Sequence, residues 1–312
     1  MAKPFVRQVI LRLLGGVTLL SRLSGMVLHR RKVRMSKSQS HIIAFYDRHP
    51  ISCGQILEKL RATRGGLEGL VPADLFAHDQ DHYGGLAAND ALAERAGIGA
   101  GSLVADFCAG LGGPARYLAH RYGASVVGLE LNAGRATGAA ALNRLVGLQR
   151  KVWMLRADVM YAPLATARAD AVISQEALLH IPDKPAALAE AFRVLKGGGR
   201  LVFTDWVVHQ ALETLESAAM WQGIGAQSLQ RLQDYDALLR RAGFEVLAVE
   251  DLTADWAGIL AERFAMYRRL RQETLDAGLP SGDEAFYQAY ARLVASVQAG
   301  TLGGGRFTAV KP

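Results

Sequence analysis

The sequence has few cysteines and no long apolar run, and both absences limit what the protein can be. Its 312 residues, half of them apolar, include only Cys53 and Cys108. Two thiols cannot build a disulfide framework or a four-ligand zinc site, so a reducing compartment and no metal are expected. Length and apolar content allow a full core in one elaborated domain or two.

Acidic residues are absent before Asp47, whereas the same segment carries many basic ones. These are Lys3, Arg7, Arg12, Arg22, Arg30, Arg31, Lys32, Arg34 and Lys37. Their summed positive charge exceeds the net charge of +7 of the whole chain, so the rest of the chain carries a small net negative charge. The basic character belongs to the N-terminal segment alone, and no nucleic-acid partner is expected for the main body.

Residues 1–45 are predicted to form a basic, amphipathic N-terminal arm. Its longest uncharged run, Leu13 to Ser21, is far shorter than the roughly 20 residues that span a bilayer. Residues 1–37 could instead lie on an anionic membrane surface, or act as a mitochondrial transit peptide in a eukaryote. An ordinary solvated helix is the third interpretation. The expected location is cytoplasmic, with membrane association left open.

The rest of the chain divides into a helical lid over 46–98 and a main domain over 99–312. After residue 99, short apolar runs alternate with helical stripes, which predicts an α/β fold with a doubly wound, mostly parallel sheet. Helical insertions are expected at about 208–242 and 253–302, and Gly303–Gly305 should turn the chain into a terminal antiparallel hairpin. A homo-oligomer is left open. The predicted strands are Leu103–Phe107, Val126–Leu131, Val152–Leu155, Ala171–Ser174, Leu201–Thr204, Phe244–Val249 and Arg306–Val310.

A glycine-rich turn from Asp106 to Gly113 follows the first predicted strand. Gly110 and Gly112 allow the backbone to approach a ligand closely, beside the free amides of the next helix. The same spacing also fits a dinucleotide fingerprint, because Glu130 lies 20 residues beyond Gly110. Glycines alone therefore do not identify the ligand.

Charge separates the two ligands, because carboxylates follow three successive strands. Asp106, Glu130 and Asp158 stand at these strand ends. Asp106 would repel an anionic pyrophosphate. It would attract S-adenosylmethionine, which carries an ammonium and a sulfonium. The difference in electrostatic energy between the two ligands is on the order of several kcal/mol. Glu130 can accept the ribose hydroxyls, and Asp158 can accept from the adenine amino group. The wider set expected around this cofactor is Cys108, Gly110, Gly112, Leu131, Val159 and Gln175.

These motifs resemble the class I S-adenosylmethionine-dependent methyltransferases over about Gly101 to Val207. The resemblance implies that Asp106 orients the amino-acid part of the cofactor, that Glu130 binds ribose and that Asp158 binds adenine. The family usually has glycine where this chain has Cys108, which we expect to pack beside the cofactor. The surrounding sequences are most similar to sarcosine and dimethylglycine N-methyltransferases, and more loosely to sterol and quinone methyltransferases.

The acceptor should lie over the carboxyl ends of the strands, where polar side chains gather. His180, Glu176 and Tyr83 are the predicted catalytic residues, with His180 as a base and Tyr83 as part of a lid. Tyr46 is a weaker lid candidate. The side chains expected to contact the acceptor are Gln175, Glu176, His180, Asp205, Trp206, His82 and Arg263.

The expected reaction is in-line methyl transfer to a small amine or zwitterionic, amino-acid-like acceptor. A thiol or thioether acid, or a lipophilic quinone, sterol or phospholipid, is the alternative. Three rival classes are a nicotinamide-dependent oxidoreductase, a nucleic-acid methyltransferase and a cofactor-binding adaptor without catalysis. Asp106 counts against the first, and the lack of an Asn-Pro-Pro-Tyr type motif after the fourth strand counts against the second.

Overall fold

The computed structural model describes residues 36–49, 51–277 and 284–312. The basic part of the predicted arm therefore lies almost entirely outside the described residues, and its membrane and targeting roles stay predictions. Among the described helices, none combines the length and the apolar character that crossing a membrane requires.

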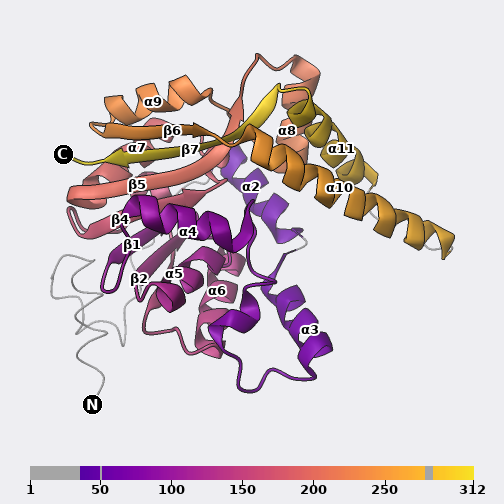
Figure 1. Cartoon of the computed structure of the whole chain (residues 1–312), viewed down its shortest axis with the longest axis horizontal. Coiled ribbons are helices and arrows are strands. Elements are labelled where there is room, and N and C mark those ends of the chain that lie inside the picture. The colour runs from indigo at the N-terminus through magenta and orange to yellow at the C-terminus, as the bar shows by residue number, and fades with distance from the viewer. Residues whose placement is uncertain (1–35, 50, 278–283) are drawn as a thin grey trace.

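A single seven-stranded sheet in the order β3-β2-β1-β4-β5-β7-β6 forms the centre of the fold (Figure 1). β1 to β5 run parallel, whereas β7 inserts between β5 and β6 and is antiparallel to both. This arrangement confirms the predicted doubly wound, mostly parallel sheet with an antiparallel end. The strands are β1 Leu103–Phe107, β2 Ser125–Glu130, β3 Val152–Arg156, β4 Ala169–Gln175, β5 Leu195–Val208, β6 Glu245–Asp251 and β7 Leu302–Val310.

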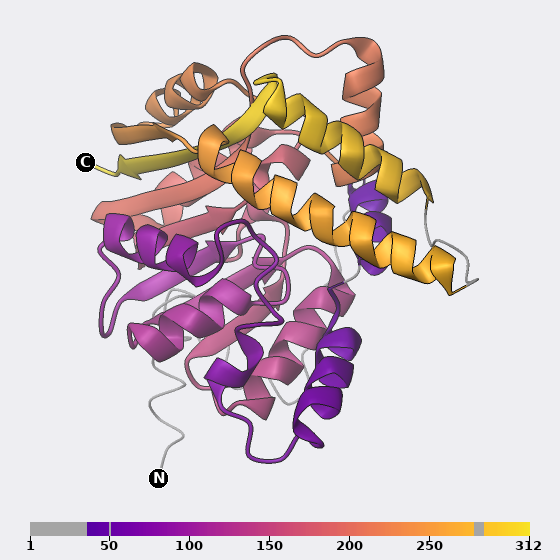
Figure 2. The same cartoon turned by 45° about the vertical axis from the view of Figure 1, so that its right-hand side comes forward.

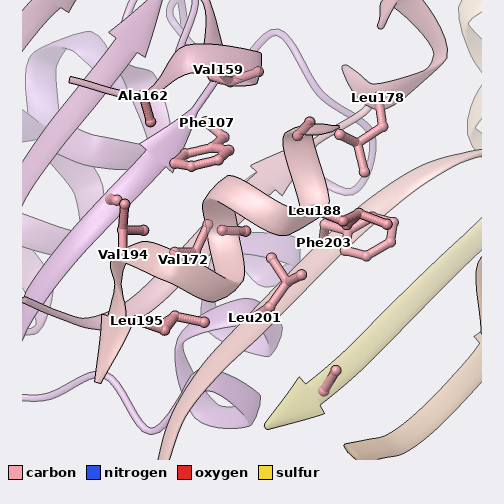
Figure 3. Packing of buried hydrophobic residues seen from close by; sticks show 14 of the residues in the cluster. Phe107, Val159, Ala162, Val172, Leu178, Leu188, Val194, Leu195, Leu201 and Phe203 are labelled. Atoms are coloured by element: carbon pink, nitrogen blue, oxygen red, sulfur yellow. The ribbon is translucent and has the colours of Figure 1, made fainter. Parts of the chain in front are cut away.

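Helices cover both faces of the sheet because successive strand residues point to opposite sides. In β1, Val104 belongs to the hydrophobic core that includes residues of α4 and α5, and Ala105 belongs to the core on the other face, which includes residues of α7 and α9. Figure 3 shows the second of these cores, where Phe107, Val172 and Leu201 meet Leu188 of α7. The helices named here are α4 Gly85–Ala96, α5 Gly113–Arg121, α7 Lys184–Val194 and α9 Leu232–Arg241, and α6 Ala133–Leu145 packs on β2 and β3.

The remaining helices gather near the carboxyl ends of the parallel strands. α10 and α11 run side by side and extend away from the sheet, and α2 lies between α8 and the strand ends (Figures 1 and 2). The predicted boundary at residue 45 falls inside α2. These elements are α2 Lys37–Asp47, α3 Cys53–Arg64, α8 Thr214–Ile224, α10 Thr253–Asp276 and α11 Glu284–Gln298, with short 3₁₀ turns η1 Pro72–Leu75, η2 Val159–Tyr161 and η3 Leu178–His180.

The turn predicted at Gly303–Gly305 is wrong, because these three glycines lie inside β7. Gly304 pairs with Trp206 of β5, and a Cβ atom at Gly304 would collide with the ring of Trp256 from α10. Glycine is needed here because α10 packs directly on the strand. β7 therefore begins at Leu302, several residues earlier than the sequence indicated.

Candidate active site

An open cavity lies at the carboxyl ends of the parallel strands, where the order of strands reverses beside β1. It encloses about 1100 Å³ including its mouth, against about 300–1000 Å³ for small-molecule sites. Its floor consists of the residues that follow β1 to β4, and α2 forms its roof. The crevice at such a reversal is where open α/β sheets bind ligands.

The glycine-rich turn forms one wall of this cavity. Cys108, Gly110 and Gly112 all have positive φ angles, of 62°, 53° and 76°. Gly113 opens α5 and touches the carbonyl of Asp79 so closely that a Cβ atom would not fit. Cys108 is the one of these positions where an L side chain bears the left-handed backbone, a conformation that glycine adopts without strain.

Asp106 is buried in the cavity wall with one oxygen unsatisfied. The side chain is 4% exposed, and its Oδ2 atom has no hydrogen-bond partner among the described residues. Burial, and then the nearby Glu130, raise the pKa of Asp106 to about 8. A buried carboxylate without a partner is costly, so the site lacks a positive or hydrogen-bonding group at this point.

Glu130 fixes the glycine-rich turn as well as facing the cavity. Its two carboxylate oxygens accept from the amides of Gly110, at 2.9 Å, and Asn132, at 2.7 Å. Burial raises the pKa of Glu130, and burial together with the surrounding carboxylates raises the pKa of Cys108 well above its usual value. Cys108 is therefore a neutral thiol and a poor nucleophile.

Asp158 contacts the roof of the cavity. One oxygen accepts from the amide of Met160, and the other accepts from the Gln39 side chain of α2 at 2.7 Å. The roof is tied down again where Asn132 donates to Asp47 at 2.8 Å. α2 is thereby attached to residues that follow β2 and β3.

Tyr46 of α2 forms a hydrogen-bonded pair with His180 of η3. The Tyr46 hydroxyl lies 2.9 Å from Nε2 of His180, and Nδ1 of His180 lies 3.1 Å from the carbonyl oxygen of Gly225. A carbonyl only accepts, so Nδ1 carries the hydrogen and Nε2 accepts from Tyr46. Burial lowers the pKa of His180 to about 4 and raises that of Tyr46, so both groups are neutral near pH 7.

Glu176 lies on the cavity wall in a strained backbone conformation, with φ of 44°. Its oxygens accept from the Thr204 hydroxyl at 2.7 Å and from the Tyr83 amide at 3.0 Å. Burial raises the pKa of Glu176 to about 7. The side chain joins β4, β5 and the loop that precedes α4.

Three predicted acceptor contacts are not among the described residues that line the cavity. β5 runs to Val208, so Asp205 and Trp206 lie within the strand and not after it. Arg263 donates to the His82 carbonyl and stacks over Tyr83. The Tyr83 ring, predicted to act in catalysis, packs against Trp206 and Trp256 in an apolar cluster.

The other predicted residues come together around the cavity, except Gly112, which precedes α5 and is not among the described residues that line it. Gln175 and His82 line the cavity, and both amide atoms of Gln175 are buried without a hydrogen-bond partner. Leu131 and Val159 lie on the floor. Within the described ranges, no group of three or more His, Cys, Asp or Glu side chains is arranged to hold a metal ion.

Sequence reasoning missed two ion pairs around the cavity. Arg116 and Asp79 are fully buried and paired at 2.9 Å, and Arg135 pairs with Asp81 at 2.7 Å while its guanidinium stacks over Tyr46. The acidic run Asp79–Asp81 was visible in the sequence. Its partners lie 37 and 54 residues further along the chain, beyond any local pattern.

Comparison with known proteins identifies a methyltransferase domain within the chain. Residues 105–203 match a methyltransferase domain. Methyltransferase GfsG of Streptomyces halstedii is 34% identical over 166 residues, which cover 52% of this chain and 59% of that protein. Sarcosine/dimethylglycine N-methyltransferase of Halorhodospira halochloris is 35% identical over 158 residues, covering 50% and 56%. The alignments thus span less than two thirds of either relative.

The fold also matches a solved structure. Phosphoethanolamine N-methyltransferase 2 of Haemonchus contortus, in complex with S-adenosyl-L-methionine, superposes with a TM-score of 0.66 at 23% identity, covering 89% of this chain and 61% of that one. The matched domain runs from β1 to β5 and supplies the floor of the cavity. The chain therefore carries a methyltransferase domain of the class I S-adenosylmethionine-dependent family, as its motifs predicted.

Proposed function

We propose that the whole chain transfers a methyl group from S-adenosylmethionine to a small acceptor with an uncharged nucleophile. The observation that carries the proposal is the buried, unsatisfied oxygen of Asp106 beside the glycine-rich turn. An ammonium group is the partner that such a carboxylate lacks. Domain membership supports the same cofactor.

The residues of the floor fit this cofactor. Asp106 would hold its ammonium, Glu130 the ribose hydroxyls and Asp158 the adenine amino group. Gly113 leaves no room for a side chain because the Asp79 carbonyl packs against it, so glycine here holds the loop before α4 against the glycine-rich turn. When bound, S-adenosylmethionine supplies an electrophilic methyl group on a positively charged sulfur.

The Tyr46–His180 pair would receive the proton that the acceptor loses. In this proposal the Tyr46 hydroxyl takes that proton while its own proton moves to Nε2 of His180, 2.9 Å away. A hydroxyl that carries the additional methyl group is an oxonium ion and a strong acid, so a base with a pKa of about 4 can accept its proton. A methylated amine is an ammonium that keeps its proton at neutral pH, so an amine acceptor does not need the pair as a base. Until that moment the neutral pair keeps the buried site free of an unpaired charge.

The charges on the cavity wall favour an acceptor without an acidic group. Of the described residues that line it, Arg135 alone has a permanent positive charge, and Asp81 neutralises it. The acids Asp79, Asp81, Asp106, Glu130, Asp158 and Glu176 surround the same space. A carboxylate or phosphate on the acceptor would meet repulsion and no unpaired cation.

The sequence suggested an amine or a zwitterion, and the cavity supports only the first of these. A neutral amine or a hydroxyl group satisfies the wall as described. Isoleucines at 42, 43 and 181 add apolar surface beside His180. A lipophilic acceptor is therefore compatible with this side of the cavity, whereas a thioether acid is not favoured.

Calorimetry with the purified full chain tests the cofactor assignment. S-adenosylmethionine should bind, and NADH should not. Tight binding of NADH would instead favour a nicotinamide-dependent oxidoreductase, whose anionic pyrophosphate would have to lie beside Asp106.

Matched acceptor pairs test the acceptor class. Each pair shares a nucleophile and differs by one acidic group: sarcosine amide and sarcosine, ethanolamine and phosphoethanolamine, a hydroquinone and its carboxylated analogue. Methyl gain measured by mass spectrometry should favour the uncharged member by about tenfold or more in kcat/KM, equivalent to about 1.4 kcal/mol. A preference for the acidic members would contradict the acceptor class. Cofactor binding with no methylation of any acceptor would favour an adaptor.

A further inference from the structure

Lys184 breaks two local rules at once. It is 2% exposed, although lysine is among the residues least often buried, and it is the first residue of α7, where the helix dipole disfavours a cation. A residue that contradicts local preferences for burial and helix position is expected to have compensating interactions elsewhere in the structure. The surroundings of Lys184 show what holds it.

The Lys184 ammonium joins two segments that meet at His180. Its Nζ donates to the carbonyl of Ile181 at 3.3 Å, and to the carbonyl and hydroxyl oxygens of Ser228 at 2.7 Å each. Ile181 directly follows His180, and Ser228 lies in the loop that begins at Gly225, between α8 and α9. All three donors of the ammonium are thereby used.

The same loop fixes the imidazole of His180. The Gly225 carbonyl accepts from Nδ1, and the amide of Gln227 donates to the carbonyl of Leu179 at 2.9 Å. Gly225 also contacts the His180 ring so closely that a Cβ atom there would lie 3.4 Å from Nδ1. The position of the loop therefore sets which ring nitrogen faces Tyr46.

Asp205 supports η3 from beneath. It is fully buried in β5, and Tyr235 of α9 donates to Oδ2, whereas Oδ1 has no hydrogen-bond partner among the described residues. The amide of Leu179 lies near enough to lower the pKa of Asp205. Lys184 and Asp205 also act on each other through space. Burial raises the pKa of Asp205 to about 6, and the lysine partly offsets this shift. Burial lowers the pKa of Lys184 to about 8, and the carboxylate partly offsets this shift. Leu178, the first residue of η3, points into the core that contains Leu188 of α7 (Figure 3).

We propose that Lys184 and Asp205 are positioning residues that hold η3 and the Gly225–Ser228 loop together, so that His180 stays in the Nδ1–H tautomer with Nε2 toward Tyr46. The inference rests on the proposed function only for its catalytic consequence. The tautomer itself is a property of the protein without any acceptor. In this proposal Asp205, which the sequence predicted to contact the acceptor, helps to hold η3 in place and does not touch the acceptor.

NMR of the full chain with ¹⁵N-labelled histidine tests the tautomer directly. The His180 signals, assigned by their loss in His180→Gln, should show a protonated Nδ1 and an unprotonated Nε2. Lys184→Met and Asp205→Asn should shift these signals toward a mixture with the Nε2–H form. Lys196→Met is the matched control, because this exposed lysine pairs with Asp170 away from η3 and should leave the signals unchanged.

Thermal unfolding of the same samples shows which variants are folded. If the buried substitutions do not fold, Ser228→Ala takes their place, since it removes one acceptor of the ammonium from a half-buried loop. A folded variant with the parental His180 signals would overturn the proposal.

Turnover provides the second readout. With the best acceptor of the panel, Lys184→Met should lower kcat about 10- to 100-fold, as misplacement of a catalytic group does, and leave S-adenosylmethionine affinity unchanged. If His180→Gln itself keeps full turnover, the proposed base is wrong while the tautomer result still stands. Loss of cofactor binding in Lys184→Met would show a general structural defect and contradict a positioning role.

Discussion

The floor and the roof of the cavity satisfy their polar groups in different ways. On the floor, Asp106 keeps a buried oxygen without a partner and a pKa raised to about 8. On the roof, Tyr46 is hydrogen-bonded to His180, and both are neutral. One wall is incomplete without a cation, and the other is already complete in the protein alone.

This difference separates binding from chemistry. An incomplete wall gains free energy when its ligand arrives, so substitutions there should change cofactor affinity. A complete, neutral wall has little to gain from a charged ligand, and its groups can respond to a proton released during the reaction. Substitutions on the floor should therefore lower cofactor affinity, and substitutions of the Tyr46–His180 pair should lower turnover.

The largest expected effect lies at the Tyr46–His180 pair, where the roof meets η3. His180→Asn should lower kcat by about 10²- to 10⁴-fold, the usual contribution of a general base, with S-adenosylmethionine affinity unchanged. Tyr46→Phe should lower kcat in the same direction, because Nε2 then loses its link to the acceptor. Turnover is followed by mass spectrometry, and affinity by calorimetry.

His120→Asn is a control for the loss of a histidine, since His120 is exposed on α5. The Tyr46–His180 pair would lose its assigned role if His180→Asn weakened cofactor binding and left kcat unchanged. Equal losses of kcat and of cofactor affinity would show that the two walls do not have separate roles in binding and chemistry.

Substitution of Asp106 on the floor comes next. Asp106→Asn should weaken S-adenosylmethionine binding by about 10- to 100-fold, which corresponds to about 1.5–3 kcal/mol for a hydrogen bond to a charged group. Calorimetry in buffers of different ionisation enthalpy should show that the parent releases a proton on binding below pH 8, because a bound cation favours the ionised carboxylate.

The same pKa fixes the sign of a stability effect. The folded chain holds the Asp106 proton up to about pH 8, whereas the unfolded chain loses it near pH 3.9, an ordinary value for aspartate. Between these values the unfolded state binds fewer protons, so the contribution of Asp106 to stability falls as pH rises. Asp106→Asn should flatten this dependence in thermal unfolding, and exposed Asp276→Asn should not. If Asp106→Asn left the pH dependence of stability or the cofactor affinity unchanged, the role assigned to Asp106 would be contradicted.

The sequence predicted the floor well because its signals are local. Asp106 and Gly110 lie within one turn, and Glu130 follows the next strand, so pattern and strand-end geometry agree. The roof depends on contacts across 119 residues from Gln39 to Asp158 and 134 residues from Tyr46 to His180, which no local pattern contains. Tyr46 was noted only as a weak lid candidate.

The error at Asp205 has a specific cause. The apolar run of the fifth strand ends at Thr204 in the sequence, so Asp205 was expected after the strand. Pairing with β7 continues to Val208 because Gly303–Gly305 form part of that strand, and Asp205 therefore stays within the sheet. The wrong prediction of a turn at Gly303–Gly305 thus led to the wrong prediction for Asp205, the residue that pairs with Gly305 across the sheet.

The smallest expected effect is at Cys108, on the floor, where backbone and side chain have opposite preferences. Its φ of 62° costs an L residue roughly 1–2 kcal/mol, and glycine removes that cost but loses about 0.5–1 kcal/mol to backbone entropy. Cys108→Gly should therefore unfold within about 1 kcal/mol of the parent in denaturant, while Cys108→Ala keeps the strain, loses the packing of the thiol and should be the less stable of the two. Because carboxylates and burial keep the thiol neutral, neither variant should lose turnover. A stability order with alanine above glycine would show that the left-handed backbone at Cys108 does not cost the chain stability. A loss of turnover in both variants would give the thiol a chemical role on a floor that we assign to binding.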